Sequence, residues 1–266
     1  MAMWTIEDAE TIELDEPVSR LRVRLVAGSV DVVASTGPAR VEVTDVEGLP
    51  VTVLIEDGVL TVGYDDVVWA TLLGWLRQEH RRATVSIAVP PDCEVELGVV
   101  SAAATVTGIR AATSARSVSG PVTLDGIAGS VEAETVSGSV ETLSLDGDLS
   151  FTTVSGDLTV VGGRTGNLRA RTVSGTVTLD VDPAADASIS LDSVSGDIAV
   201  RLPAEPSLEV SLTSTSGDLR SSHDGLQLTR RPGRMTLTGQ LGSGDGGRLR
   251  GRTVSGDIAL LSGAHA

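Results

Sequence analysis

Apolar and polar residues alternate along most of this chain, and pairs of alternating stretches meet at a recurring corner. In residues 168–179, every second residue up to Thr172 is apolar or small, and the alternation then shifts by one residue at Val173. Successive side chains of a strand point to opposite faces, so such a shift predicts a bend or bulge. Both stretches then turn their apolar sides toward one core, which favours strands over helix.

The corner is part of a repeat that extends over most of the chain. Its four-residue form, Ser/Thr-Val/Thr-Ser-Gly, begins at residues 117, 135, 153, 172, 193, 214 and 253, and related windows place corners at 26, 100 and 237. Repeats of about 20 residues with aligned apolar positions are typical of a stacked solenoid. The sequence therefore predicts an all-β, single-stranded β-solenoid (β-helix) of about nine to ten rungs, with successive repeats stacked ~4.8 Å apart.

Residues 33–92 interrupt the repeat. The turn signal Glu56-Asp57-Gly58 and the pair Pro90-Pro91 separate or end alternating runs, so we expect a small inserted antiparallel sheet that closes one end of the solenoid. Residues 1–32 then form the first rung and residues 93–266 the remaining repeats, all within one structural domain. The alternating runs of the insertion span residues 40–44, 51–55, 59–63 and 84–89.

Residues 66–82, near the N-terminal end, have the pattern of one short helix, with apolar residues on one face and a basic end. One interpretation is a lid on the solenoid with solvated arginines. The other is a docking face for a second copy, another protein or a membrane surface. The residues of this possible interaction surface are Trp69, Leu72, Leu73, Trp75, Leu76, Arg77, Arg81 and Arg82.

Charge and composition narrow the choice of partners. The 266 residues include 36 acidic and 20 basic ones, all of the latter arginine, for a net charge of −16. Such a charge repels nucleic acid, so no nucleic-acid partner is expected. The single Cys93 excludes an internal disulfide and a cysteine zinc cluster.

The start of the chain and its apolar stretches bear on location. The first residues are acidic and lack the basic and apolar regions of a secretory signal. The longest apolar stretch, residues 67–76, falls short of the ~20 residues that span a bilayer, so no transmembrane segment is expected. The predicted location is the cytoplasm, with peripheral membrane association left open.

No catalytic residue, cofactor site or metal site is predicted. His80, His223 and His265 have no partner at metal-ligand spacing, and the repeated corner serines occupy equivalent outward positions. Residues 242–247 match GxGxxG in letters only, because no βαβ unit precedes them.

Four aspartates follow the repeat glycine at one outward position: Asp157, Asp197, Asp218 and Asp257. Asp197 and Asp218 belong to successive repeats, and stacking in sequence order would place them roughly 5 Å apart. A solvated acidic stripe is the simpler interpretation, and a calcium site is the alternative.

The repeated Thr-Val-Ser-Gly-Asp units, together with residues 21–32, 57–65 and 252–260, resemble one bacterial family. It is the β-solenoid family labelled "putative adhesin", of unknown function and related to toastrack domains. The absence of lysine, with abundant Ala, Gly, Val and Arg, is similar to an actinobacterial member. The resemblance covers nearly the whole chain and implies the solenoid fold. It brings no catalytic residues, and the adhesin label implies export.

Three classes of function remain. The first is a non-catalytic binding or scaffold protein whose partner is an unidentified protein or cell-envelope component. The second is a self-assembling, bactofilin-like polymer, for which an open C-terminal rung at residues 253–261 would serve as the joining edge. A homo-oligomer is therefore possible. The third is a carbohydrate-active enzyme with a site on one solenoid face, although no acid, base and electrophile recur together.

Overall fold

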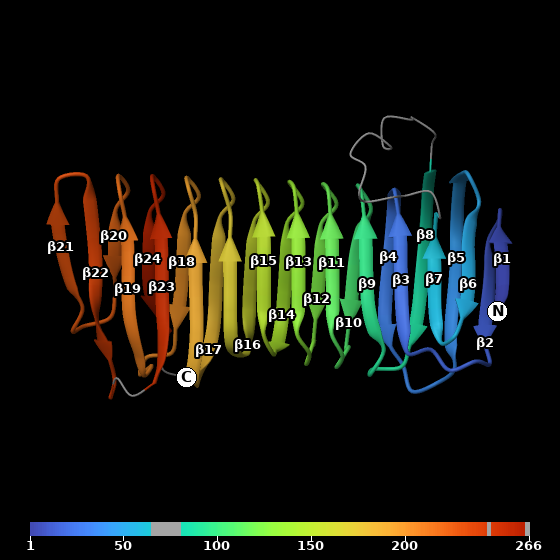
Figure 1. Ribbon diagram of the computed structural model, residues 1–266, viewed down its shortest axis with the longest axis horizontal. Coiled ribbons are helices and arrows are strands. Elements are labelled where there is room, and N and C mark those ends of the chain that lie inside the picture. Colours follow the sequence, from blue (N-terminus) through green and yellow to red (C-terminus); the bar gives the residue numbers. More distant parts are fainter. Residues whose placement is uncertain (65–80, 244–245, 264–266) are drawn as a thin grey trace. The chain divides into compact units, whose positions relative to one another are not determined.

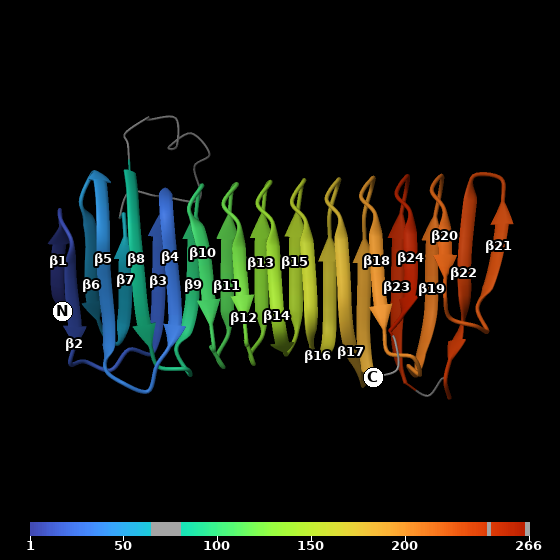
Figure 2. The same cartoon turned by 180° about the vertical axis from the view of Figure 1, so that it is seen from behind.

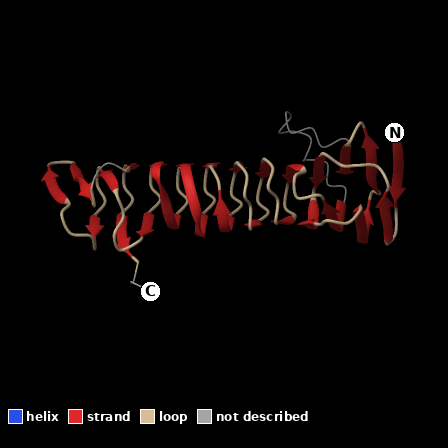
Figure 3. Ribbon diagram, turned by 90° about the horizontal axis from the view of Figure 1, so that it is seen from below, coloured by secondary structure: helices blue, strands red, loops and turns tan. Residues whose placement is uncertain are grey.

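The structure is a computed structural model that describes residues 1–64, 81–243 and 246–263. In these ranges the chain forms strands, turns and loops, without a helix and hence without one able to cross a membrane (Figure 3). Two compact units divide the chain, Met1–Ser130 and Val131–Ala266. The all-β prediction is confirmed, and each unit is a stack of strands of the predicted solenoid kind.

The N-terminal unit stacks parallel strands and edges them with antiparallel ones. β3 pairs in parallel with β7 and β9, and β4 pairs in parallel with β8 and β10. β5 pairs antiparallel with β2 and β8, and β6 antiparallel with β1 and β7. The strands are β1 (Ala2–Ile6), β2 (Glu10–Leu14), β3 (Arg20–Leu25), β4 (Ala27–Ala34), β5 (Ala39–Gly48), β6 (Val51–Glu56), β7 (Val59–Gly63), β8 (Arg81–Val89), β9 (Glu94–Val99), β10 (Ala103–Thr107), β11 (Thr113–Ser117) and β12 (Val122–Asp125).

Two local predictions in this unit can be compared with the structure. The Asp57-Gly58 turn has positive φ at both residues and joins β6 to β7, which confirms the expected hairpin. The expected helix over residues 66–82 lies outside the described residues except at its end. There the prediction is wrong, because Arg81 and Arg82 begin strand β8, which is held between β4 and β5.

The C-terminal unit follows the predicted repeat spacing. Val131 is aligned with Leu149, and Leu149 with Leu168, offsets of 18 and 19 residues. Its strands are β13 (Val131–Thr135), β14 (Val140–Asp146), β15 (Leu149–Thr153), β16 (Leu158–Arg171), β17 (Val177–Asp192), β18 (Ile198–Leu202), β19 (Leu208–Ser214), β20 (Leu219–Ser221), β21 (Gln227–Arg231), β22 (Arg234–Leu241), β23 (Gly247–Thr253) and β24 (Ile258–Ser262).

The last repeat of this unit is stacked out of sequence order. β23 pairs in parallel with β17 on one side and with β19 on the other, and β24 lies between β18 and β20 in the same way. Figures 1 and 2 show these two strands, in red, between the orange strands of earlier repeats. Stacking in sequence order is therefore wrong at this point, and residues 253–261 do not form an open terminal rung.

A hairpin explains the change of order. The weak repeat expected around residues 236–241 is wrong: it belongs to β22, which pairs antiparallel with β19 and with β21. The chain reverses at Pro232-Gly233, where Gly233 has positive φ, and β22 runs back along one edge of β19. The other edge of β19 then receives β23.

Five corners of the C-terminal unit are closed by a buried hydroxyl and a glycine. Thr172 Oγ1 accepts a hydrogen bond from Gly175 N–H at 2.8 Å, and a Cβ on Gly175 would lie 1.8 Å from the Gly156 carbonyl oxygen. This confirms both the hydroxyl–backbone bonding and the close approach expected at the repeat glycine. Inward-facing aliphatic residues fill the core, together with fully buried Phe151, as predicted. Equivalent bonds, of 2.9–3.0 Å, join Thr153 to Gly156, Ser193 to Gly196, Ser214 to Gly217 and Thr253 to Gly256.

Candidate anion-binding face

Four exposed arginines share the outer side of one wall in the C-terminal unit. Arg169 and Arg171 lie on β16, and Arg250 and Arg252 on β23, each alternating with buried residues. β17 runs between them, and the register aligns Ser190 with Arg169 on one side and with Arg250 on the other. Since neighbouring strands are about 4.8 Å apart, the two arginine pairs are separated by about 10 Å. We call these four residues the arginine face.

The arginine face carries a net positive charge. No ion pair joins any of its four guanidinium groups to another residue within the described ranges. Asp192 on β17 is aligned with both Arg171 and Arg252 but forms no ion pair with either. At the margin, Arg248 is neutralised by Glu209, with Nε 3.0 Å from the carboxylate.

The equivalent strands of the N-terminal unit show the opposite arrangement. Arg20 on β3 donates to Glu94 on β9 at 2.9 Å, and Arg22 donates to Glu96 at 3.1 Å. In the C-terminal unit, serine and threonine occupy most of the corresponding neighbouring positions, such as Ser190 beside Arg169. The sequence thus pairs Arg20 and Arg22 with glutamates across the strands, whereas the four arginines of the arginine face lie mostly beside serine and threonine.

The sequence analysis did not predict the arginine face, although the sequence contains a motif that belongs to it. Residues 169–175 and 250–256 both read Arg-x-Arg-Thr-Val-Ser-Gly. Stacking in sequence order would put three repeats between them, whereas the insertion of β23 leaves only β17 between the two arginine pairs. The motif alone therefore could not show that its two copies act on one surface.

An exposed column of valines runs along the corner next to the arginine face. Each is the second residue of a corner motif, and each leaves about half of its surface exposed, between 46% and 52%. The serine that follows is tied to the neighbouring repeat: Ser174 Oγ donates to the Val154 carbonyl and Ser195 Oγ to the Val173 carbonyl, at 3.4 and 3.2 Å. The valine column consists of Val136, Val154, Val173, Val194 and Val254.

The aspartates lie on the wall beyond the corner and link neighbouring repeats. Asp157 Oδ1 accepts from Thr176 N–H at 2.7 Å, Asp197 Oδ1 from Asp257 N–H at 2.8 Å, and Asp257 Oδ1 from Asp218 N–H at 2.8 Å. The expected adjacency of Asp197 and Asp218 is wrong, because Asp257 lies between them. Over the described residues no group of three or more His, Cys, Asp or Glu side chains is placed to hold a metal ion.

Of the interaction surface predicted from the sequence, the structure describes only Arg81 and Arg82. Trp69, Leu72, Leu73, Trp75, Leu76 and Arg77 lie outside the described residues. Arg81 stacks over the ring of Tyr64, 5.6 Å from its centroid, and Arg82 is exposed. Burial raises the pKa of Tyr64, and the Arg81 guanidinium opposes this rise.

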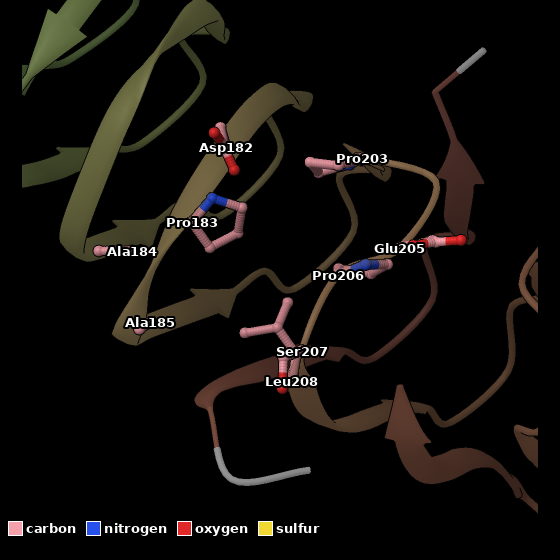
Figure 4. Close-up of a pocket in the computed structure, with 9 residues that line it drawn as sticks. All are labelled: Asp182, Pro183, Ala184, Ala185, Pro203, Glu205, Pro206, Ser207 and Leu208. Carbon is pink, nitrogen blue, oxygen red and sulfur yellow. The ribbon is translucent and has the colours of Figure 1, made fainter. Parts of the chain in front are cut away.

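A small cavity and the buried Cys93 offer little chemistry. A cavity of about 140 Å³ in the C-terminal unit lies between the 182–185 bend of β17 and the 203–208 segment (Figure 4). It is smaller than the ~300–1,000 Å³ of ordinary ligand pockets, and Ser207 on its rim is hydrogen-bonded to Ser243 at 3.0 Å. Cys93 is fully buried, and burial raises the pKa of its thiol to about 11, which keeps it protonated and unreactive.

The stacked strands and recurring corners define an all-β repeat protein of the toastrack kind. The family model described as Toastrack DUF4097 matches residues 95–261, and the chain belongs to this family. The resemblance to a toastrack-related family is thereby confirmed over these residues. No curated protein matches the chain.

Several crystal structures share the fold. A "putative lipid binding protein" from Parabacteroides distasonis is 14% identical, with a TM-score of 0.52 over 97% of this chain and 98% of its own. A "putative adhesin" from the same organism is also 14% identical, with a TM-score of 0.52 over 98% and 97%. One from Bacteroides fragilis is 10% identical, with a TM-score of 0.50 over 96% and 97%. At these identities the likeness shows the fold alone.

Proposed function

We propose that this chain is a non-catalytic binding protein that recognises an anionic partner through the arginine face. The observation that carries the proposal is the set of four guanidinium groups on one wall that form no ion pair with any residue the structure describes. A guanidinium presents its donors in a planar fork that matches carboxylate and phosphate oxygens. Because the wall is a hydrogen-bonded parallel sheet, the backbone positions of the four arginines are fixed before binding, which lowers the entropic cost of binding.

The chemistry around the face supports binding over catalysis. Apart from Asp192, its polar neighbours on the adjoining strands are serines and threonines, and four corner serines donate their hydroxyl hydrogens to backbone carbonyls. Within the described ranges, no carboxylate or imidazole is hydrogen-bonded to Ser155, Ser174, Ser195 or Ser216 as a base would be. The face thus offers positive charge and hydrogen bonds in a regular array.

The strongly negative chain as a whole does not prevent such binding. Its net charge of −16 acts at long range, but at physiological salt the Debye length is about 8 Å. Charges farther away than this are largely screened, so an anion at the face responds mainly to the nearby arginines.

The proposal is tested by salt elution from immobilised heparin, a soluble polyanion used as a probe. The test variant replaces Arg169, Arg171, Arg250 and Arg252 with glutamine. The control replaces four ion-paired arginines, Arg20, Arg22, Arg110 and Arg201, and so has the same net charge. We expect the native chain and the control to be retained and the test variant to flow through. Equal elution of test and control variants would overturn the proposal.

The finer parts of the account remain predictions. They include the count of nine to ten rungs, the inserted sheet, the part of the expected helix that lies outside the described residues, and the division of the chain at residues 33 and 93. Location in the cytoplasm also stays a prediction, as does self-association, for which residues 253–261 do not supply the expected open edge.

A further inference from the structure

We propose that the anionic partner is a membrane surface, contacted jointly by the arginine face and the valine column. This inference rests on the proposed function and adds the source of the negative charge. A soluble polyanion needs only the arginines, whereas binding to a lipid interface also gains from apolar side chains that enter the headgroup region.

The two sets of residues adjoin each other on the same repeats. Arg171 is followed two residues later by Val173, and Arg252 by Val254, with one buried threonine between the members of each pair. Val194 lies between these two valines in the column, since Val254 N–H donates to the Val194 carbonyl. A ridge of exposed apolar groups therefore borders the arginine-bearing wall.

The exposure of the valines requires an explanation that the fold does not supply. Inward residues of the same repeats, such as Leu168 and Leu249, are at most 1% exposed, whereas the five column valines are exposed by about half. Thr215 occupies the next position of the column, because Ser216 N–H donates to the Val254 carbonyl. A hydroxyl-bearing residue is thus compatible with the corner, so an apolar one is not needed for its geometry.

Three of the acidic groups near the ridge are directed along the stack, whereas Asp192 and Glu134 lie on the arginine side of the corner, two residues before Val194 and Val136. Asp157, Asp197 and Asp257 lie on the wall beyond the corner, and each uses one carboxylate oxygen to accept a backbone N–H of the next repeat. Asp192 lies within the arginine-bearing wall and offsets part of its charge. We therefore assign the membrane contact to the ridge and the arginine side of the corner.

The test is co-sedimentation of the full chain with vesicles of phosphatidylcholine, alone or mixed with anionic phosphatidylglycerol. Each arginine near an anionic surface contributes about fivefold to partitioning, or about 1 kcal/mol. Replacing Arg171 and Arg252 with glutamine should therefore weaken binding to the mixed vesicles about 30-fold. Replacing Arg110 and Arg201 gives the same change in net charge and should leave binding unchanged.

The valine variants separate a membrane from a soluble polyanion. Changing Val173, Val194 and Val254 to threonine keeps the side-chain shape and should weaken vesicle binding by up to about fourfold per residue. The same variant should elute from heparin as the native chain does. Circular dichroism and the melting temperature establish that each variant is folded.

Three results would overturn the membrane assignment: no binding to mixed vesicles, equal binding to neutral ones, or full vesicle binding by the threonine variant. If heparin retention still depends on the arginine face in any of these cases, the proposed function stands with a soluble anionic partner. If neither probe binds, both proposals fail.

Discussion

Replacing Gly175 with alanine should destabilise the C-terminal unit strongly. The added Cβ would lie 1.8 Å from the carbonyl oxygen of Gly156, a backbone atom of the neighbouring repeat. Real Cβ atoms do not approach a backbone atom so closely, so adjacent repeats would have to move apart. Strain of this kind costs about 1–3 kcal/mol. Separation also threatens the 2.8 Å bond from Gly175 N–H to Thr172, and an unpaired buried group costs about 1–3 kcal/mol more.

The expected loss is thus about 2–6 kcal/mol in the free energy of unfolding. It is measured by urea unfolding followed by circular dichroism. Because stacked repeats can unfold in parts, hydrogen exchange should show whether protection falls first at the repeats on either side of Gly175. The control is Gly37→Ala, where the new Cβ meets nothing closer than 3.6 Å and φ is not positive.

Both variants lose the flexibility of glycine in the unfolded chain, so their difference isolates the close approach. If the free energies of unfolding of Gly175→Ala and Gly37→Ala differ by less than about 0.5 kcal/mol, the close packing between repeats at Gly175 is wrong.

Three further predictions concern buried and charged groups. Thr172→Val leaves Gly175 N–H without its acceptor and should lower the free energy of unfolding by about 1–3 kcal/mol; an unchanged urea midpoint would contradict the hydroxyl bond. The pKa of Cys93 is raised from 9.0 to about 11 in the folded chain, so its contribution to stability is present below pH 9 and is lost as the pH rises toward 11. Between pH 9 and 11 the urea midpoint should fall less in Cys93→Ala than in the native chain, and an equal fall in both would refute the raised pKa of Cys93. Asp257→Ala removes the acceptor for Asp218 N–H and should cost about 1 kcal/mol, and millimolar calcium should not shift the native melting temperature; a clear calcium shift would favour the ion site instead.

The repeat made much of the fold predictable. Alternating apolar residues and the corner at Thr172-Val173 reflect requirements that every repeat meets locally, namely an inward apolar side and a closed turn. The Asp57-Gly58 hairpin was equally accessible, because positive φ is costly for most other residue pairs. Such features depend on neighbours in the sequence and can be read without knowing the stacking order.

The order of stacking could not be read in the same way. All repeats carry similar edges, so β23 fits against β17 as well as β19 would. The order of stacking is set by the Pro232-Gly233 hairpin, which places β22 along one side of β19. The candidate site depends on this one choice, because it brings Arg252 near Arg171. The sequence analysis instead pointed to residues 66–82, where three arginines lie within six residues of the chain.

A disulfide test addresses the insertion of β23 most directly. In a Cys93→Ala background, Ser190→Cys is combined with either Arg250→Cys or Ser211→Cys, and the chain is oxidised gently. Ser190 and Arg250 are aligned on adjacent strands, within reach of a disulfide, whereas Ser211 lies one strand farther, at about 10 Å. The account predicts a rapid crosslink between positions 190 and 250 and none between 190 and 211. A crosslink between 190 and 211 alone would show stacking in sequence order, and the two arginine pairs would then not share one surface.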